Sequence, residues 1–201
     1  MTQVIPLCVP PWDEGDALRC GALWSPGDKF HVLRGANLET LLDWLPRRFD
    51  PRWQGRPPLV PEMLPVQTWE LNLRTQLSEA AWDRIRRHIY KSAGWTCEIC
   101  GKREGRLEAH EQWSLHNETG VQELCGILAL CPFCHKCHHL GIAKRLGMLP
   151  AVKQHMLQVN NWNTAQLDAA IVEAYELWEQ QSAWPWVVDL SWFTKSSLAY
   201  V

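Results

Sequence analysis

The residues best suited to chemistry in this chain are cysteines that occur in two pairs. Each pair has the spacing Cys-x-x-Cys, and thirty residues separate the pairs: Cys97, Cys100, Cys131 and Cys134. A turn of this length lets two thiolates reach one tetrahedral ion at about 2.3 Å, and two such turns complete its ligand set. The spacing therefore predicts a structural Zn²⁺ site. Buried free thiols and a redox-active pair are the alternatives, and four matched cysteines argue against both.

Histidines gather in the same part of the chain, and three of them have spacings that suit a second metal site. His135 and His139 are four residues apart, so a helix that begins near Cys134 would place both on one face. His110 lies in the segment 107–111, which we expect to form a strand. A strand, a loop, a second strand and a helix would bring His110 beside the other two. Three imidazoles that leave coordination positions open are typical of a catalytic metal site.

Together these residues resemble the HNH, or His-Me finger, endonuclease family in its form with a zinc ribbon. The resemblance rests on three stretches of sequence and a further histidine: Cys97-Glu98-Ile99-Cys100-Gly101, Leu107-Glu108-Ala109-His110-Glu111, Leu128-Ala129-Leu130-Cys131-Pro132-Phe133-Cys134-His135, and His139. It implies a ββα-metal module, in which two strands and a helix hold one catalytic divalent ion while the four cysteines hold a separate zinc.

The resemblance also implies roles for individual residues. His110, His135 and His139 match the ligands of the catalytic ion, which would be Mg²⁺, Mn²⁺, Ni²⁺ or Zn²⁺. Glu111 matches the family's general-base histidine, so Glu111 and His110 are the candidate catalytic residues. A carboxylate can take a proton from water, but its ordinary pKa of about 4.3 makes it a weaker base than imidazole unless burial raises that value.

Two positions depart from the family pattern. One is Glu111 itself, and the other is Gly126, which stands where the family has an asparagine that orients the base. Asn117, in the loop of the expected hairpin, is a candidate substitute for that asparagine. In an alternative register His110 is the base, and the residue before it, Ala109, cannot bind a metal. In either register one catalytic part is atypical.

Charge is distributed unevenly along the chain, although the net charge is only −2. Residues 84–106 carry seven Lys or Arg against two Asp or Glu, which gives +5. Such a block can contact the phosphates of a nucleic acid, and it is also compatible with a solvated helix face and an exposed hairpin. The candidate nucleic-acid contacts are six basic residues: Arg84, Arg87, Lys91, Lys102, Arg103 and Arg106.

Three regions of the chain must position these residues. Residues 1–76 are rich in proline and poor in periodicity, so we expect an irregular arm packed by its tryptophans. Residues 77–147 would hold a helix and the zinc and ββα-metal module, and residues 148–201 a helical region with a tail. The expected fold class is α+β, with a small ββα-metal module and a four-cysteine zinc knuckle flanked by helices and by the irregular arm.

Periodicity and capping residues locate the expected elements more closely. Ser78 and Gly94 mark the ends of one helix, whose apolar face holds Trp82, Ile85 and Ile89. The expected elements are helices near 37–44, over 79–93, near 151–159 and over 165–182, and a strand or extended tail at 187–193.

Composition excludes several classes of protein. A chain that is 46% hydrophobic and 21% charged has the composition of a globular protein. The longest nearly apolar run, residues 124–134, is about half of a membrane span, so neither a transmembrane helix nor a membrane partner is expected. Residues 1–20 lack the pattern of a secretory signal. We therefore expect a cytoplasmic protein with reduced thiols.

The function that these features favour is metal-dependent hydrolysis of phosphodiester bonds in nucleic acid, with DNA favoured over RNA. The alternative is a catalytically degenerate HNH-fold zinc module that binds nucleic acid or a protein partner without cleavage. A third hypothesis is a metalloenzyme that acts on a different substrate. A homodimer remains open as well.

Overall fold

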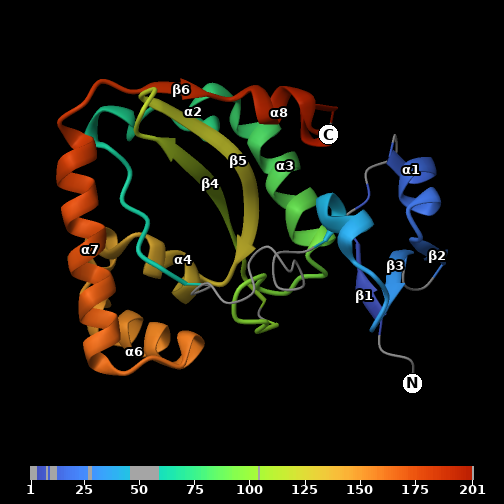
Figure 1. Ribbon diagram of the computed structural model, residues 1–201, viewed down its shortest axis with the longest axis horizontal. Coiled ribbons are helices and arrows are strands. Elements are labelled where there is room, and N and C mark those ends of the chain that lie inside the picture. The colour runs from blue at the N-terminus through green and yellow to red at the C-terminus, as the bar shows by residue number, and fades with distance from the viewer. Residues whose placement is uncertain are drawn as a thin grey trace.

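The computed structural model describes most of the chain: residues 4–7, 9, 13–26, 29–45, 59–103 and 105–200. Within these residues the fold is mixed α+β, with two three-stranded sheets and eight α-helices (Figure 1). The sheets belong to two hydrophobic cores, one built from residues between Ile5 and Leu45 and the other from residues between Leu59 and Leu198. The expected α+β class is confirmed at this level.

The first core belongs to a small antiparallel sheet, whose strands lie in the order β1-β3-β2. In Figure 1 this sheet lies at the right, apart from the long hairpin at the centre. Its elements are β1 (Val4–Pro6), α1 (Glu14–Arg19), β2 (Leu23–Ser25), β3 (Lys29–Leu33) and the 3₁₀ helix η2 (Glu39–Trp44).

The expectation of an irregular arm is wrong for this part of the chain. Strands of three to five residues contain too few alternating positions for a period of two to stand out. The helix expected near 37–44 is the 3₁₀ helix η2, in which Leu41 is buried. Residues 46–58 of the expected arm lie outside the described residues.

A long antiparallel hairpin forms the centre of the second core. Its strands are β4 (Glu108–His116) and β5 (Val121–Leu130), and β6 (Val187–Asp189) pairs in parallel with β5. His110 on β4 lies opposite Leu128, and a bulge follows Gln112. The strand expected within 187–193 is therefore present as β6, and α8 (Ser191–Lys195) follows it.

Helix α3 (Glu79–Ser92) packs against the hairpin and agrees with its sequence prediction. The Ser78 side chain accepts a hydrogen bond from the Ala81 N–H, which caps the helix as expected. Trp82, Ile85 and Ile89 are buried on its inner face.

Four helices follow the hairpin, and the two predicted by periodicity are present. Asn163 caps the longest of them with a capping box. None of the described helices is long and apolar enough to cross a membrane. The four helices are α4 (Pro132–His138), α5 (Leu140–Arg145), α6 (Leu149–Asn160) and α7 (Thr164–Ser182).

A stretch without regular structure, residues 59–65, runs between α7 and β4 toward α4 in Figure 1, and we call it the connecting segment. The Asn160 side chain of α6 donates a hydrogen bond to the Leu59 carbonyl at 2.7 Å. The Glu62 N–H donates to the His138 carbonyl at 3.1 Å. These two bonds fix the segment against the helices that follow the hairpin. Three short elements remain: η5 (Val66–Thr68), α2 (Leu73–Gln76) and η6 (Ser197–Tyr200).

Candidate metal centres

The four predicted cysteine ligands lie together at the start of α4. Their sulfur atoms all lie within 4.8 Å of one another, and the Sγ atoms of Cys100 and Cys131 are 3.8 Å apart. Sulfur atoms bound at about 2.3 Å to a tetrahedral ion lie about 3.8 Å apart. The spacing therefore fits a metal such as zinc, and the four cysteines could hold one as expected from their sequence.

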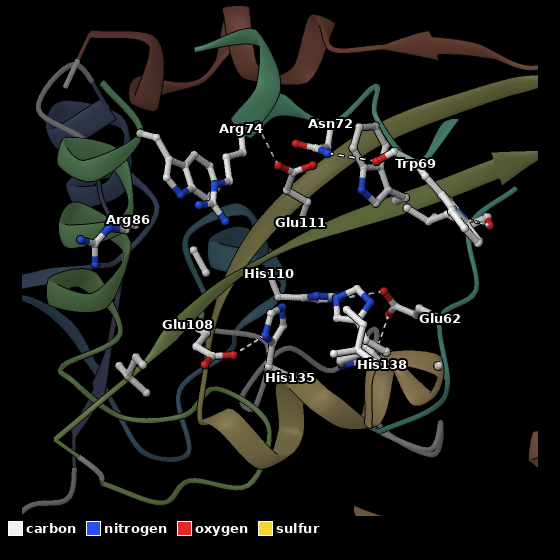
Figure 2. Close-up of a pocket in the computed structure, with 18 of the residues that line it drawn as sticks. Glu62, Trp69, Asn72, Arg74, Arg86, Glu108, His110, Glu111, His135 and His138 are labelled. Carbon is white, nitrogen blue, oxygen red and sulfur yellow. Dashed lines mark hydrogen bonds and ion pairs between the residues drawn. The ribbon is translucent and has the colours of Figure 1, made fainter. Parts of the chain in front are cut away.

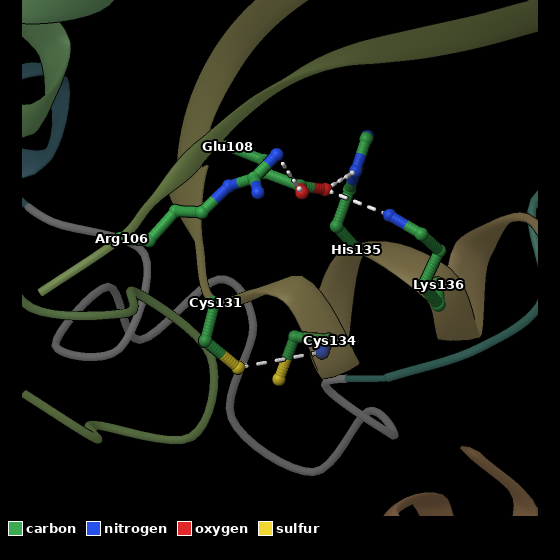
Figure 3. Close-up of polar contacts among 6 residues, drawn as sticks. All are labelled: Arg106, Glu108, Cys131, Cys134, His135 and Lys136. Atoms are coloured by element: carbon green, nitrogen blue, oxygen red, sulfur yellow. Dashed lines mark hydrogen bonds and ion pairs between the residues drawn. The ribbon is translucent and has the colours of Figure 1, made fainter. Parts of the chain in front are cut away.

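Local backbone geometry explains how the two cysteine pairs form. The Gly101 N–H donates to the Cys97 carbonyl at 2.9 Å, and Gly101 has φ of +72°, a conformation that favours glycine. In the second pair, Cys131 is the N-cap of α4 and its sulfur accepts a hydrogen bond from the Cys134 N–H at 3.4 Å (Figure 3). Both turns thus point two sulfur atoms inward.

The cysteine cluster is largely buried, and its thiols contact one another. Cys97, Cys131 and Cys134 are buried, and His155 from α6 places Nε2 3.1 Å from the Cys134 sulfur. Hydrogen bonds from Cys100 and the other thiols hold the pKa of Cys97 far below its ordinary value, whereas the same contacts raise the pKa of Cys134.

The structure also brings together the three histidines expected to hold a second ion. His110 comes from β4, His135 from α4, and His139 is the C-cap of α4. Their ligand atoms lie within 4.8 Å of one another. The rings meet edge to face, with centroids 4.8–5.3 Å apart and interplanar angles of 68–88°. We call these three residues the histidine triad.

Two residues that the sequence analysis did not select join this site, namely Glu62 and His138 (Figure 2). Glu62 Oε2 lies 2.9 Å from His110 Nε2, and Glu62 Oε1 lies 3.3 Å from His138 Nδ1. The His138 ring stacks on His110 at a centroid distance of 4.3 Å. His138 stands three residues after His135, which is a helical signal. Glu62 lies 48 residues before His110 in a proline-rich stretch, where nothing local marks it.

A carboxylate also orients His135. Glu108 Oε2 hydrogen-bonds His135 Nδ1 and accepts a bond from Lys136 Nζ at 2.9 Å (Figure 3). The bond to His135 lowers the pKa of Glu108 to about 2, burial opposes this shift, and Lys136 adds to it. Because Nδ1 of His135 is engaged by a carboxylate, Nε2 is left for a metal ion.

Burial sets the charge state of the site. It lowers the pKa of His110 to about 4 and that of His139 to about 3, so both imidazoles are neutral at pH 7, the form that binds metals. Burial raises the pKa of the Glu62 carboxyl, but His138 and His110 lower it by more, so it lies well below its ordinary value. Glu62 is therefore an anion beside the neutral imidazole of His110.

The histidines open onto a cavity of about 1420 Å³. Of the six basic residues predicted to contact nucleic acid, Arg106 alone lines this cavity in the described part of the chain. Arg84, Arg87 and Lys91 lie on the exposed face of α3, and Lys102 and Arg103 are exposed beside the first cysteine pair. The cavity wall instead receives arginines from several elements: Arg74, Arg86, Arg106 and Arg145.

Glu111 lines the same cavity, next to His110 on β4. Its carboxylate accepts hydrogen bonds from the N–H groups of Leu73 and Arg74, both at 3.2 Å, at the start of α2. Burial raises the pKa of Glu111, while these two bonds act in the opposite direction. Its role as a base remains a prediction, and Figure 2 shows it above His110 near Arg74.

Neither of the two other positions raised by the family pattern lines the cavity. Gly126 pairs with Gln112, and a Cβ there would lie 3.0 Å from Gln112 Oε1, so glycine leaves room for that side chain. Asn117, in the turn of the hairpin, accepts a hydrogen bond from Gln181 of α7 at 3.0 Å. The turn is the opposite end of the hairpin from His110, so Asn117 does not replace the missing asparagine.

The two clusters differ in what they can do chemically. Four converging thiols can hold an ion but leave it no free position, whereas imidazoles and carboxylates beside a cavity can hold an ion that also meets a substrate. In comparisons with known proteins, no family model, no curated protein and no solved structure matches this chain.

Proposed function

We propose that this chain is a metal-dependent endonuclease of the HNH type, which hydrolyses phosphodiester bonds in nucleic acid, with DNA as the favoured substrate. The observation that carries the proposal is the convergence of His110, His135 and His139 at the wall of a large cavity. They come from a β-hairpin and from the helix that follows it, which is the order that the family resemblance implies. The cysteine cluster would hold a separate structural zinc.

The histidine triad fits a catalytic ion in donor type and protonation. His110 and His139 are neutral at pH 7, and Glu108 keeps Nε2 of His135 available. A divalent ion, when bound, supplies a Lewis acid that polarises a phosphate oxygen and stabilises the charge on the leaving oxygen. The protein's own part is to hold the three imidazoles at fixed positions beside the cavity.

Glu111 is the proposed general base. The two backbone N–H groups of α2 hold its carboxylate in one orientation, and burial raises its pKa toward the range useful at neutral pH. It would accept the proton of a water molecule that attacks the phosphorus atom. Because the pKa of Glu111 is raised, the acid limb of the pH–rate profile should lie above the ordinary pKa of a glutamate carboxyl.

The cavity offers suitable contacts for a nucleic-acid chain. Arg74, Arg106 and Arg145 line it and can contact phosphates, so binding should weaken as salt concentration rises. Trp69 also lines the cavity and is 58% exposed, which leaves its ring open to stack on a base. These contacts favour a nucleic acid over a small substrate.

Cleavage by the Glu111→Gln variant tests the proposal. The wild type, freed of contaminating nucleases, is incubated with DNA and RNA in Mg²⁺, Mn²⁺, Ni²⁺ or Zn²⁺. Loss of a general base should lower the rate about 10²- to 10⁴-fold while the metal content is unchanged. Glu118→Gln, in the exposed turn of the same hairpin, is the matched control and should cleave at the wild-type rate.

Absence of cleavage by the wild type would contradict the proposal. If the wild type binds DNA but cleaves it with none of these ions, the chain is the non-cleaving zinc module. The engagement of Glu111 by α2 and the glycine at position 126 are the observations that favour this second candidate. A His135→Ala/His139→Ala double variant that keeps full cleavage would also contradict the assignment of the ion to the triad.

A further inference from the structure

Glu62 has no part in the proposed hydrolysis, although its carboxylate lies against a member of the histidine triad. Glu62 Oε2 lies 2.9 Å from His110 Nε2, and Glu62 Oε1 lies 3.3 Å from His138 Nδ1. An ionised carboxylate can accept hydrogen bonds but has none to donate. The proton in the 2.9 Å contact is therefore carried by Nε2 of His110.

This contact decides which nitrogen of His110 can bind an ion. A neutral imidazole carries one proton on one ring nitrogen and a lone pair on the other. With the proton on Nε2, the lone pair of His110 is on Nδ1. Figure 2 shows Glu62 and His135 on different sides of His110. His135 has the complementary arrangement, because Glu108 engages its Nδ1 and Nε2 is left for the ion.

The His110 ring is also held on its face. The ring of His138 stacks on it with centroids 4.3 Å apart and an interplanar angle of 16°. The side chain of His138 is fully buried, and His110 is only 4% exposed. A close-packed ring against one face and a carboxylate at one edge leave His110 little freedom to rotate.

The fold fixes the carboxylate independently of the hairpin. Glu62 belongs to the connecting segment, which hydrogen-bonds to α4 through its own N–H and to α6 through Asn160. Pro61 and Pro65 are buried on either side of Glu62, which restricts the backbone there. The orienting group thus comes from a part of the chain outside the hairpin and α4.

We infer that Glu62 is a positioning residue, which holds His110 in its Nε2–H form so that Nδ1 binds the ion of the histidine triad. The inference rests on the ion that the proposed function assigns to the triad. A histidine that binds a metal commonly donates its other N–H to a carboxylate, which fixes the ring and makes it a stronger ligand. Loss of such a partner typically weakens metal binding about 10- to 100-fold.

Nitrogen-15 NMR of the histidine rings tests the inference on the full chain at pH 7. The cysteine-bound ion is retained and no ion is added at the triad, and the His110 signal is identified by its absence from His110→Gln. We expect the Nε2–H form in the wild type. Glu62→Leu, which has a similar size but no acceptor, should lose this preference, whereas Glu62→Gln keeps an acceptor oxygen and should retain it.

Titration of the same proteins with Zn²⁺ measures the affinity of the triad. The ion should bind about 10- to 100-fold more weakly to Glu62→Leu than to the wild type, and Glu62→Gln should lie between the two. Glu123→Leu is the matched control, because Glu123 pairs with the exposed His116 at 2.9 Å on the same hairpin. It should bind the ion as the wild type does.

These measurements separate the inference from the proposed nuclease function. An Nδ1–H form in the wild type overturns the inference even if Glu62→Leu fails to fold. Weaker binding by Glu62→Leu with an unchanged His110 form also overturns it, because Glu62 would then have a merely structural role. A wild type that binds the ion as expected but cleaves no nucleic acid overturns the nuclease proposal and leaves the role of Glu62 intact.

Discussion

The cysteine cluster and the histidine–glutamate cluster lie at opposite ends of one short helix. Cys131 and Cys134 occupy the first turn of α4, and His138 and His139 mark its end. The cysteine cluster has four ligands of one kind and lies in the protein interior. The other cluster mixes imidazoles with carboxylates and opens onto the 1420 Å³ cavity. The first arrangement suits an ion that holds structure, and the second an ion that meets a substrate.

Because the two clusters share helix α4, the positions of the histidines depend on how the cysteines hold the start of that helix. Helix α4 has seven residues, whereas isolated helices shorter than about 12–15 residues are marginal in water. An ion held by Cys131 and Cys134 would fix the first turn of α4 and tie it to the first cysteine pair. The histidines further along α4 would then keep their positions relative to His110. An ion in the cysteine cluster would thus support the geometry of the histidine–glutamate cluster.

The largest expected effect comes from removing one ligand of the cysteine cluster. Cys131→Ala should release the structural ion and unfold the second core, because a structural zinc contributes on the order of 10 kcal/mol, comparable to the stability of a whole domain. Elemental analysis and thermal unfolding followed by circular dichroism would show both losses. Cys125→Ser is the control, since Cys125 is exposed and outside the cluster. A Cys131→Ala protein that unfolds at the same temperature as the wild type would contradict the structural role of the cysteine cluster.

A smaller effect is expected from replacing a carboxylate of the histidine–glutamate cluster. Glu108→Gln removes the negative charge of the group that orients His135, and such partners typically contribute about 10- to 100-fold to metal affinity. Titration with Zn²⁺ of protein that retains its cysteine-bound ion should show a weakened histidine site, and elemental analysis should show an unchanged cysteine site. Glu123→Gln serves as the control, because Glu123 pairs with the exposed His116 on the same hairpin. If Glu108→Gln weakens the cysteine site equally, the two clusters are not separate in the way proposed.

Sequence reasoning was most successful where ligands lie close together along the chain. The spacings of Cys97, Cys100, Cys131 and Cys134 correspond to two local turns, so the pattern predicts the cluster completely. The triad was predicted from the separation of His135 and His139 on a helix and from a strand at His110. In both cases local backbone periodicity decides which side chains can meet.

The rest of the site depends on packing between distant segments. Glu62 reaches His110 only because the connecting segment is fixed to α4 and α6. The predicted basic residues of α3 face outward, because the apolar stripe shows which face is buried but not what lies along its edge. The cavity therefore receives Arg74 and Arg145, from elements far apart in sequence, which no charge run indicated.

The smallest effect that we predict concerns the attachment of the connecting segment. Asn160→Ala removes the hydrogen bond to the Leu59 carbonyl, which should lower the free energy of unfolding by about 1 kcal/mol. Because Glu62 then loses part of its support and holds the His110 ring less firmly, the ion proposed for the histidine triad should bind several-fold more weakly, while the cysteine site is unaffected. Gln158→Ala is the neighbouring control for the metal titration, since Gln158 is exposed on the same helix. Equal weakening at the cysteines would mean that Asn160 supports the whole helical layer and that the connecting segment has no separate role.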